Sequence, residues 1–570
     1  MTTNLHAEAR PDGWWKSAVV YQVYPRSFSD SNGDGIGDIP GITSRLDYLA
    51  ELGIDVLWLS PVYRSPQKDN GYDISDYQDI DPLFGTLEEL DELMEKAHAR
   101  GIKLVMDLVV NHTSDQHPWF QEARDPNSPK RDWYIWRPAR PGHTPGEPGA
   151  EPNVMAASFS PSAWTYDPES GEYYLGIFSP YQPDLNWENP EVREAVYEMM
   201  RWWVERGVDG FRMDVINLIS KPEWLTSGEA LPEIAPYHCM QNGPRLNEFL
   251  QEMHREVGLS ENSLFTVGEM PGATVDVAQE VTDPARHELN MVFTFEHVDL
   301  DRVAGSHKWD LAPLELPVLK ENLAHWQVGL ENAGWNSLYW DNHDQPRAVS
   351  RFGDDAPEFR VASAKTLATV LHMHKGTPYV YQGEEFGMTN APFTKIEDYQ
   401  DIESLNHYNL ASAEGVSEET ILNSLLVKSR DHARTPVQWD VSENAGFTSG
   451  TPWFGVNPNY TEINAEAAVA DADSVFHHYR QLIALRHADE VVREGRFELL
   501  LADHSQIWAF TRTLGDRTLL VVANCSSETV EIPAEGLPSV EGAKLVFGTR
   551  VLDGVSTLAP WESQVLELAR

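Results

Sequence analysis

The stretch TLEELDELMEKAHARGIKLVMDLVVNH, residues 86–112, carries a helical pattern and a strand pattern in direct succession. Its apolar residues up to position 97 fall on one face of a helix: Leu87, Leu90, Leu93, Met94 and Ala97. Gly101 is placed to end that helix as a C-cap, and the apolar run from Lys103 is typical of a buried strand. A helix that leads at once into a buried strand is the repeating unit of α/β folds.

The same alternation continues along the chain. Buried strands are predicted at VVYQVYP (from Val19), DVLWLSP (from Asp55), KLVMDLVVNH (from Lys103), GFRMDV (from Gly210), LFTVGEM (from Leu264), NMVFTFE (from Asn290), WNSLYWDNHD (from Trp335) and TPYVYQGEE (from Thr377). Amphipathic helical patterns lie between them, for example at residues 189–207, 243–258 and 357–376. Strands and helices that alternate in this number favour a (β/α)8 TIM barrel over an open doubly wound sheet.

Three regions depart from this alternation. Residues 113–183, rich in Pro, Gly, Ser and Trp, are too long for a plain loop and predict a small inserted domain after strand 3. A mostly polar insertion is expected at about residues 388–447, after strand 8. From about residue 494, short alternating runs predict an antiparallel β-sandwich. We therefore assign the barrel to residues 1–112 and 184–493, the inserted domain to 113–183 and the sandwich to 494–570.

Composition and the N-terminus limit the class of protein. Apolar residues make up 41% of the 570 residues and aromatic residues 10%, which excludes a disordered chain. No apolar run approaches the roughly 20 residues that a membrane-spanning helix needs. The N-terminal sequence MTTNLHAEARPDGWWKS lacks a basic region followed by an apolar one, so we expect no secretion signal and a cytoplasmic location.

The charge of the chain and its two cysteines exclude several partners. A formal net charge of −46 would repel nucleic acid and anionic membranes, so we expect neither as a partner and predict a small neutral substrate. The acidity also favours solubility without any partner. Cys239 and Cys525 stand far apart and are interpreted as free, buried thiols. A monomer or a small homo-oligomer is expected.

Polar residues stand where the predicted barrel strands end. They are Asn111 and His112 on strand 3, Arg212 and Asp214 on strand 4, Glu269 on strand 5, and Asp341, Asn342, His343 and Asp344 on strand 7. Catalytic residues of such barrels lie at the carboxyl ends of the strands, so Asp214, Glu269 and Asp344 are expected at one mouth. An acidic pair suits glycosidic bond cleavage, in which one carboxylate attacks the anomeric carbon and a neutral carboxyl protonates the leaving oxygen. A divalent metal site is the competing use, but the phosphate-binding glycine loop that often accompanies it is missing.

Four sequence blocks at these strand ends resemble a known family. DLVVNH, GFRMDV, VGEM and DNHDQPR are similar in order, spacing and strand placement to the four signature regions of glycoside hydrolase family 13, the α-amylase family. The blocks DNGYDISDY, QPDLNWENP, YQGEEFGMTN and ARTPVQWD resemble its oligo-1,6-glucosidase and α-glucosidase branch. The resemblance extends over essentially the whole chain.

The resemblance implies a role for each of the three acids. Asp214 would be the nucleophile, Glu269 the general acid and base, and Asp344 the residue that stabilises the oxocarbenium-like transition state. Arg212, two residues before Asp214 on the same face of the strand, is expected to keep the Asp214 carboxylate ionised. Glu269 needs a raised pKa to protonate the leaving oxygen. This two-step route predicts retention of the α-configuration and a carboxyl separation of about 5 to 5.5 Å.

The resemblance also implies the residues that bind the substrate. They are Asp69, Tyr72, His112, Phe178, Gln182, Arg212, Val215, His343 and Arg430. His112 and His343 would bind hydroxyls of the first glucose. Asp69 and Arg430 would close the pocket behind its non-reducing end, which implies an exo-acting enzyme. Tyr72 offers a stacking face for the sugar ring.

Val215, directly after the predicted nucleophile, bears on the linkage that is cleaved. Members of the family that prefer α-1,6 linkages typically carry Val there, so the resemblance favours isomaltose-type substrates, with α-1,4 activity and transglycosylation left open. The alternatives are a trehalose-6-phosphate hydrolase, which shares VINLISK, and a sucrose-isomerising enzyme. Lys308 and Glu403 resemble contacts to the second sugar. The acidity and the lack of an obvious basic cluster disfavour a phosphorylated substrate.

The loop DSNGDGIGD, residues 30–38, resembles the first half of a calcium-binding EF-hand loop. Its predicted ligands are Asp30, Asn32, Asp34, the Ile36 carbonyl and Asp38, which would hold one structural Ca²⁺, with Mg²⁺ as the alternative ion. The loop follows a strand, and the Glu expected at its twelfth position is Gly41, so a structural ion is favoured over a calcium sensor. An Asx-rich turn without an ion is the alternative.

A non-catalytic, amylase-like interaction protein is the rival from another class. Such relatives lack the catalytic carboxylates and carry a membrane anchor. This chain has all three acids and no predicted spanning segment, so the sequence favours an enzyme.

Overall fold

The structure, a computed structural model, describes residues 13–227, 230–533, 535–548 and 556–569. The predicted cytoplasmic location rests partly on residues 1–12, which lie outside the described residues. The described chain forms two compact units. The first contains residues 58–94 and 103–294, and the second contains residues 13–57, 95–102 and 295–570.

Eight parallel strands form the central sheet. They are β1 (Val20–Val23), β2 (Val56–Leu59), β5 (Lys103–Leu108), β9 (Gly210–Met213), β10 (Phe265–Glu269), β11 (Met291–Phe293), β12 (Ser337–Leu338) and β13 (Thr377–Tyr381). Their order in the sheet is β11-β10-β9-β5-β2-β1-β13-β12, so consecutive strands are neighbours and the first pairs with the last. This is the order of a (β/α)8 barrel, and the predicted fold class is confirmed.

The register within the first unit decides which side chains stand abreast. Asp107 of β5 pairs with Arg212 of β9, and Arg212 pairs in turn with Val267 of β10. All four residues of β9 are buried. Two more residues along β10 bring the chain to Glu269, at the carboxyl end of the strand.

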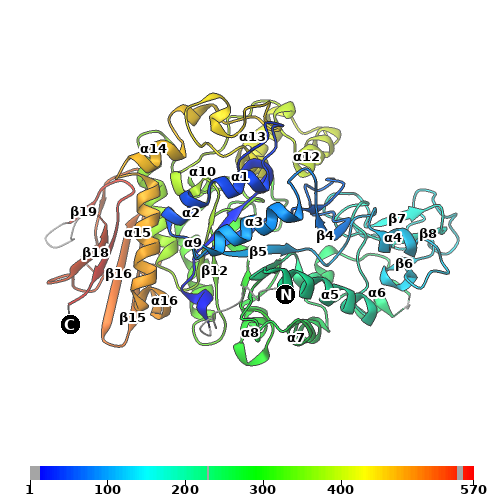
Figure 1. The fold of residues 1–570 in the computed structure, drawn as a ribbon. Helices are drawn as coiled ribbons and strands as arrows, with labels where there is room; N and C mark the ends of the chain where they lie inside the picture. The colour runs from blue at the N-terminus through cyan, green and yellow to red at the C-terminus, as the bar shows by residue number, and fades with distance from the viewer. Residues whose placement is uncertain (1–12, 228–229, 534, 549–555, 570) are drawn as a thin grey trace. The chain divides into compact units, whose positions relative to one another are not determined.

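Helices connect the barrel strands, and Figure 1 labels most of them. They are α1 (Ile39–Ser44), α2 (Leu46–Leu52), α3 (Leu87–His98), α5 (Pro190–Arg206), α7 (Leu246–Val257), α8 (Val275–Thr282), α9 (Leu316–Gly329), α10 (Ala348–Phe352) and α11 (Arg360–His372). The helices expected from the four amphipathic stretches are confirmed. Gly101, three residues after α3, has a φ of 78°, which suits a glycine that ends a helix.

The inserted segment after β5 builds a small sheet of its own. It contains α4 (Pro118–Ala123) and the three-stranded antiparallel sheet β6 (Trp136–Arg137), β8 (Glu172–Leu175) and β7 (Trp164–Asp167). Also in the first unit are the antiparallel pair β3 (Tyr63–Arg64) and β4 (Asp76–Ile80) and the short helix α6 (Glu223–Thr226).

In the second unit, β13 is followed by helices and then by antiparallel sheets. The helices are α12 (Ile402–Ala413), α13 (Glu418–Lys428), α14 (Ala465–Ala470), α15 (Val475–Ala488) and α16 (Glu490–Glu494). A five-stranded sheet contains β14 (Arg496–Leu500), β15 (Ile507–Leu514), β16 (Arg517–Asn524), β20 (Ser563–Glu567) and β18 (Lys544–Gly548), and a two-stranded one contains β17 (Val530–Glu531) and β19 (Thr557–Leu558). The strands β15 and β16 lie beside α16 (Figure 1).

The predicted antiparallel C-terminal region is thereby confirmed, whereas the residue boundaries of the three predicted domains stay a prediction. Cys239 and Cys525 are both free, as predicted, but each residue is only partly buried. The expectation of buried thiols is met only in part, although burial raises the pKa of the Cys525 thiol to about 12. No helix in the described ranges is both long and apolar enough to cross a bilayer.

Candidate active site

Three carboxylates of the first unit share one arginine. Arg212 Nη1 lies 2.6 Å from Asp107 Oδ1 and 2.6 Å from Asp214 Oδ1, and Arg212 Nη2 lies 2.7 Å from Glu269 Oε2. The Tyr72 hydroxyl donates to Asp107 Oδ2 at 3.3 Å. The fold thus brings the predicted nucleophile and the predicted acid and base to one guanidinium group.

Burial raises the pKa of both aspartates that bind Arg212. Desolvation raises the pKa of Asp214 to about 6, although the charge of Arg212 lowers it. Desolvation likewise raises the pKa of Asp107 to about 6, against the lowering effect of Arg212. The expected effect of Arg212 is therefore present but smaller than that of burial. Above about pH 6, Asp214 is mainly a carboxylate, the form that a nucleophile requires.

Val215 has an unusual backbone conformation beside these acids. Its φ of 36° and ψ of 41° place a β-branched residue in the left-handed region, where such residues are rare. In this conformation its backbone N–H donates to Glu269 Oε2 at 3.0 Å. Its side chain packs in an apolar cluster with Ile177 and Leu218. Val215 therefore contacts the predicted acid and base through its backbone, a contact that the sequence gives no sign of.

A second cluster of the first unit contains most of the predicted sugar-binding residues. Gln182 Nε2 donates to Asp69 Oδ2 at 2.9 Å and lies 3.3 Å from His112 Nε2. The rings of His112 and Phe178 are 5.1 Å apart. His112 Nε2 also lies 3.1 Å from the Tyr72 carbonyl oxygen. Burial lowers the pKa of His112 to about 3, so its ring is neutral near pH 7.

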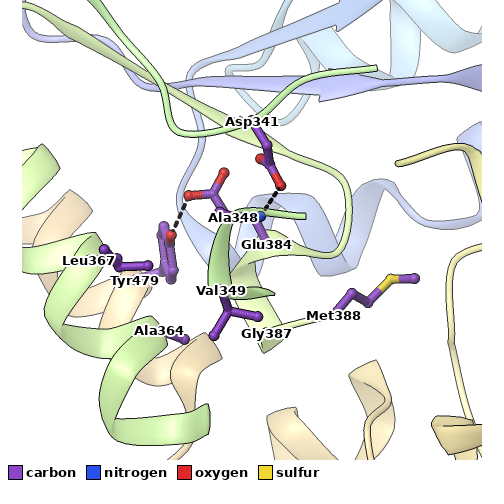
Figure 2. Close-up of a pocket in the computed structure, with 9 residues that line it drawn as sticks. All are labelled: Asp341, Ala348, Val349, Ala364, Leu367, Glu384, Gly387, Met388 and Tyr479. Carbon is purple, nitrogen blue, oxygen red and sulfur yellow. Dashed lines mark hydrogen bonds between the residues drawn. The ribbon is translucent and has the colours of Figure 1, made fainter. Parts of the chain in front are cut away.

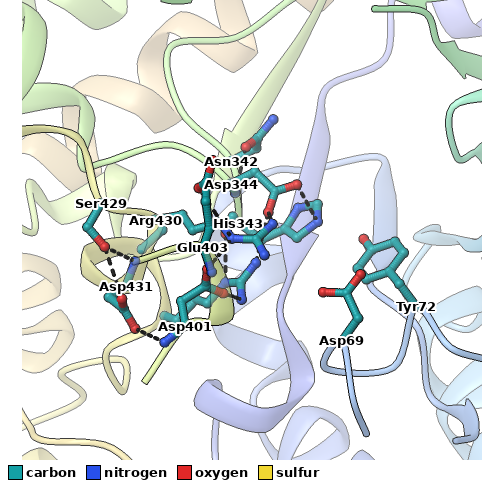
Figure 3. Close-up of polar contacts among 12 residues, drawn as sticks. Asp69, Tyr72, Asn342, His343, Asp344, Asp401, Glu403, Ser429, Arg430 and Asp431 are labelled. Atoms are coloured by element: carbon teal, nitrogen blue, oxygen red, sulfur yellow. Dashed lines mark hydrogen bonds and ion pairs between the residues drawn. The ribbon is translucent and has the colours of Figure 1, made fainter. Parts of the chain in front are cut away.

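In the second unit, two arginines and a histidine hold Asp344 (Figure 3). Arg430 Nη1 and Arg434 Nη2 each donate to Asp344 Oδ1 at 2.8 Å. His343 Nε2 lies 3.1 Å from Asp344 Oδ2. The fully buried Asp401 pairs with both arginines, at 2.8 Å and 2.5 Å. The Asp344 side chain is 29% exposed, so this acid keeps access to solvent while its neighbours are buried.

Lys308 and Glu403, the residues that resemble contacts to the second sugar, form an ion pair in the second unit. Lys308 Nζ lies 2.5 Å from Glu403 Oε2. Glu403 also lies 3.9 Å from Arg430 Nε. The positive charge of Lys308 is therefore already matched by a carboxylate.

Asp341, the first polar residue after β12, lies in a small cavity with Glu384 and Tyr479 (Figure 2). Asp341 Oδ2 accepts the N–H of Ala348, the first residue of α10, at 2.8 Å. Glu384 Oε1 accepts the Tyr479 hydroxyl at 2.6 Å. Burial raises the pKa of Asp341 to about 6 and that of Glu384 well above its ordinary value. Asp341 thus belongs to a buried carboxyl pair that binds the start of α10.

Comparison with known proteins identifies the family of the chain. The family model described as "Alpha amylase, catalytic domain" matches residues 22–495. The chain belongs to the α-amylase family. The oligo-1,6-glucosidase of Parageobacillus thermoglucosidasius is 55% identical to it over 97% of this chain and 99% of that protein. The predicted family is confirmed, and with it the class of enzyme, a glycoside hydrolase.

Two solved structures of the α-amylase family have closely similar folds. The trehalose-6-phosphate hydrolase of Bacillus licheniformis has a TM-score of 0.91 at 47% identity, over 98% of this chain and 100% of that chain. The isomaltulose synthase of Klebsiella sp. LX3 has a TM-score of 0.90 at 41% identity, again over 98% and 100%. Members with different named activities therefore have this same fold.

The loop of residues 30–38, in the second unit, is a series of turns closed by side-chain oxygens. Asp30 Oδ1 accepts the N–H of Asn32 and Gly33, and Asn32 and Asp34 each accept the N–H two residues on. Asp38 Oδ1 instead accepts the Gly41 N–H at 2.6 Å and caps α1. Carboxylate, amide and carbonyl oxygens are the donors that Ca²⁺ prefers, so the donor set fits.

The structure explains why Gly41 stands where an EF-hand has Glu. A Cβ atom on Gly41 would lie 1.9 Å from the Ser29 carbonyl oxygen, so no side chain fits. Within the described ranges, no group of three or more His, Cys, Asp or Glu side chains is arranged to hold a metal ion. The calcium site therefore stays a prediction.

Four buried charged residues were not selected from the sequence: Asp107 and Asp401 of the clusters above, and Asp184 and Lys221, which lie beside His112. Each is almost completely buried. Asp107 interrupts the apolar run of β5, and a charged residue inside a buried strand is the one signal that pointed to it. Lys221 and Asp184 pair at 2.6 Å, although they stand 37 positions apart in the sequence, with α5 and β9 between them. Nothing local in the sequence predicts that pair.

Proposed function

We propose that this member of the α-amylase family is an exo-acting, retaining α-glucosidase that releases the non-reducing terminal glucose of short oligosaccharides, preferentially of isomaltose type. The shared guanidinium group is the observation that carries the proposal, because it ties Asp214 and Glu269 to one residue. Acids held this close suit the retaining route, in which the carboxyl groups stand nearer to each other than in inverting enzymes.

In the proposed reaction, Asp214 attacks the anomeric carbon while Glu269 gives its proton to the leaving oxygen. The bond to the aglycone breaks and a covalent bond from glucose to Asp214 forms. Glu269 then takes a proton from water, whose oxygen displaces Asp214 and restores the α-configuration. The Val215 N–H, at 3.0 Å from Glu269 Oε2, orients the acid.

Asp344 would stabilise the positive charge that develops on the sugar in the transition state. Three side chains fix its carboxylate, and its partial exposure leaves room for a substrate. The proposed substrate-binding residues are Asp69, Tyr72, His112, Phe178, Gln182, Arg212, Val215, His343 and Arg430. The family resemblance assigns both Asp69 and Arg430 to the terminal glucose, and exo action is proposed on that ground.

The α-1,6 preference rests on Val215 and on the likeness to a named oligo-1,6-glucosidase. A trehalose-6-phosphate hydrolase is the second candidate, since a solved structure with that name is 47% identical. The pairing of Lys308 with Glu403 argues against it, because a substrate phosphate would have to displace a carboxylate. Transglycosylation and sucrose isomerisation would use the same covalent intermediate.

We further propose a structural Ca²⁺, with Mg²⁺ as the alternative ion, held by Asp30, Asn32, Asp34, the Ile36 carbonyl and Asp38. Such an ion would stabilise the loop between β1 and α1 and take no part in bond cleavage. We also propose a cytoplasmic location, a neutral oligosaccharide as the substrate, and a monomer or small homo-oligomer. The net charge of −46 supports the neutral substrate.

Incubation with isomaltose, maltose, sucrose, trehalose and trehalose 6-phosphate, with the released sugars followed by chromatography, tests the proposal. We expect isomaltose to be cleaved fastest, with α-glucose as the first product, and Asp214→Asn to abolish turnover. Faster cleavage of maltose would refute the linkage preference, and faster cleavage of trehalose 6-phosphate would establish the second candidate. Near-normal turnover by Asp214→Asn would refute the mechanism.

A further inference from the structure

A chain of buried polar contacts leads from Lys221 to His112 in the first unit. Lys221 Nζ lies 2.6 Å from Asn111 Oδ1 and 2.6 Å from Asp184 Oδ2, and it donates to the Leu218 carbonyl at 2.8 Å. Asn111 Nδ2 in turn lies 3.2 Å from His112 Nδ1. Each of these four polar side chains is at most 2% exposed, so water does not replace any of these contacts.

The ion pair decides which way the Asn111 amide faces. An ammonium group can only donate hydrogen bonds, so the amide oxygen must face Lys221. The Asn111 side chain also forms a hydrogen bond with Asp184, and since a carboxylate only accepts, the amide nitrogen must be the donor. Burial raises the pKa of Asp184, whereas the charge of Lys221 and the hydrogen bonds from Lys221 and Asn111 lower it. The reversed amide would set two donors against each other in a buried site, at a cost comparable to a lost hydrogen bond. The amide NH₂ group is therefore held toward His112.

This orientation fixes the position of the proton on the neutral His112 ring. The Asn111 NH₂ group donates to Nδ1, which must then carry the lone pair, and the ring proton is left on Nε2. That nitrogen lies 3.1 Å from an acceptor, the Tyr72 carbonyl oxygen. The nearby Gln182 Nε2 has other acceptors, Asp69 Oδ2 at 2.9 Å and the Tyr72 carbonyl at 3.4 Å, so it does not compete for Nε2.

The backbone holds the parts of this arrangement in place. Asp184 and His112 form an antiparallel β-bridge, and the Leu185 N–H donates to the Asn111 carbonyl at 2.9 Å. Lys221 follows the predicted nucleophile by seven residues in the sequence. The contact therefore ties the end of β5 to the segment that follows β9.

We propose that Lys221 and Asp184 are positioning residues that act through Asn111 to keep His112 in its neutral Nε2–H tautomer. The Nε2–H group, which the Tyr72 carbonyl accepts at 3.1 Å, is then shared with a hydroxyl of the bound sugar in a three-centre hydrogen bond, and the ring offers that hydroxyl a donor and not an acceptor. The sugar contact rests on the proposed function, whereas the tautomer does not.

The tautomer can be read directly by NMR of the full-length protein labelled with ¹⁵N-histidine. Protonated and unprotonated ring nitrogens have well separated ¹⁵N shifts, and the His112 signals are assigned by their loss in His112→Asn. We expect wild-type His112 to carry its proton on Nε2 between pH 5 and pH 8, as a ring whose pKa is about 3 allows. A proton on Nδ1 would overturn the proposal without any variant.

Two variants test the origin of that tautomer. In Asn111→Asp, a carboxylate replaces the NH₂ donor, so we expect the ring proton to move to Nδ1 and kcat/KM for isomaltose to fall roughly 10- to 100-fold. Lys221→Met combined with Asp184→Asn removes the ion pair without leaving a buried charge unpaired. In this double variant we expect signals of both His112 tautomers in the spectrum and a roughly tenfold fall in kcat/KM for isomaltose.

Lys320→Met is the matched control, because Lys320 is also fully buried and donates to three backbone carbonyls, those of Leu501, His504 and Ile507. It should lower the melting temperature but leave the His112 signals and kcat/KM unchanged. An unchanged tautomer in both test variants would overturn the proposal. If wild-type His112 is the Nε2–H form but no α-glucoside is cleaved, the proposed function fails and the positioning role stands.

Discussion

Replacing Asp107 by Asn should move the acid limb of the pH profile to lower pH. Asp214 must be ionised to attack the anomeric carbon, and its pKa is about 6. In the wild type, kcat/KM should therefore fall about tenfold per pH unit below about pH 6. The carboxylate of Asp107 is one of the causes that raise the pKa of Asp214.

The size of the shift follows from the shared arginine. Asp107 Oδ1 and Asp214 Oδ1 each lie 2.6 Å from Arg212 Nη1, so the two oxygens are at most about 5 Å apart. At an effective dielectric constant of about 20, two like charges at that distance repel by about 3 kcal/mol, equivalent to about 2 pKa units. The pKa of Asp107 is itself about 6, so only about half of its carboxyl groups are ionised at the pH where kcat/KM begins to fall. We therefore expect a shift of about one unit, to about pH 5.

The assay is the pH dependence of kcat/KM for isomaltose, with circular dichroism to check folding at each pH. Asp209→Asn is the control, because Asp209 is also fully buried and accepts the Leu104 N–H at 2.7 Å just before β9 begins. Its acid limb should stay at about pH 6. A limb that stays in place in Asp107→Asn, or moves to higher pH, would refute the reasoning about repulsion across Arg212.

Three further predictions concern linkage, metal and stability. Val215→Thr should raise the ratio of maltose to isomaltose cleavage by roughly tenfold, measured as kcat/KM, and an unchanged ratio would contradict the role of this side chain. Chelation should lower the melting temperature while leaving kcat at 25 °C nearly unchanged, and Asp30→Ala, which removes one predicted ligand, should not respond to the chelator. Glu385, fully buried and bonded to the hydroxyls of Tyr21 and Tyr48, has a pKa raised by burial to about 7. The folded state thus binds its proton more tightly than the unfolded state, so stability is full below about pH 4.5 and is lost as the pH rises to about 7, by about 3 kcal/mol. Between pH 5 and pH 8, the melting temperature of Glu385→Gln should fall less than that of the wild type. Parallel plots of melting temperature against pH for the two proteins would contradict this.

Many residues of the candidate site could be predicted from the sequence, because they stand at the ends of predicted strands. Apolar runs of four to eight residues separated by amphipathic helices predict a barrel, and a barrel places the last residues of its strands on one face. Asp214 and Glu269 could therefore be selected from the sequence alone. The length of each strand could not be predicted in this way: the run from Trp335 yields only the two residues of β12, because pairing needs a neighbour and not only an apolar sequence.

The sequence by itself determined the fold class, the family and the identity of the acids, since periodicity and short motifs are local properties of the chain. Only the tertiary structure decided how those acids behave. The pKa of Asp214 depends on its burial and on Asp107, and Asp107 meets Arg212 from 105 residues away. The left-handed backbone of Val215 and the orientation of the Asn111 amide likewise arise from contacts between distant segments. Desolvation and Coulomb interactions depend on distance in space, and that distance exists only once the chain has folded.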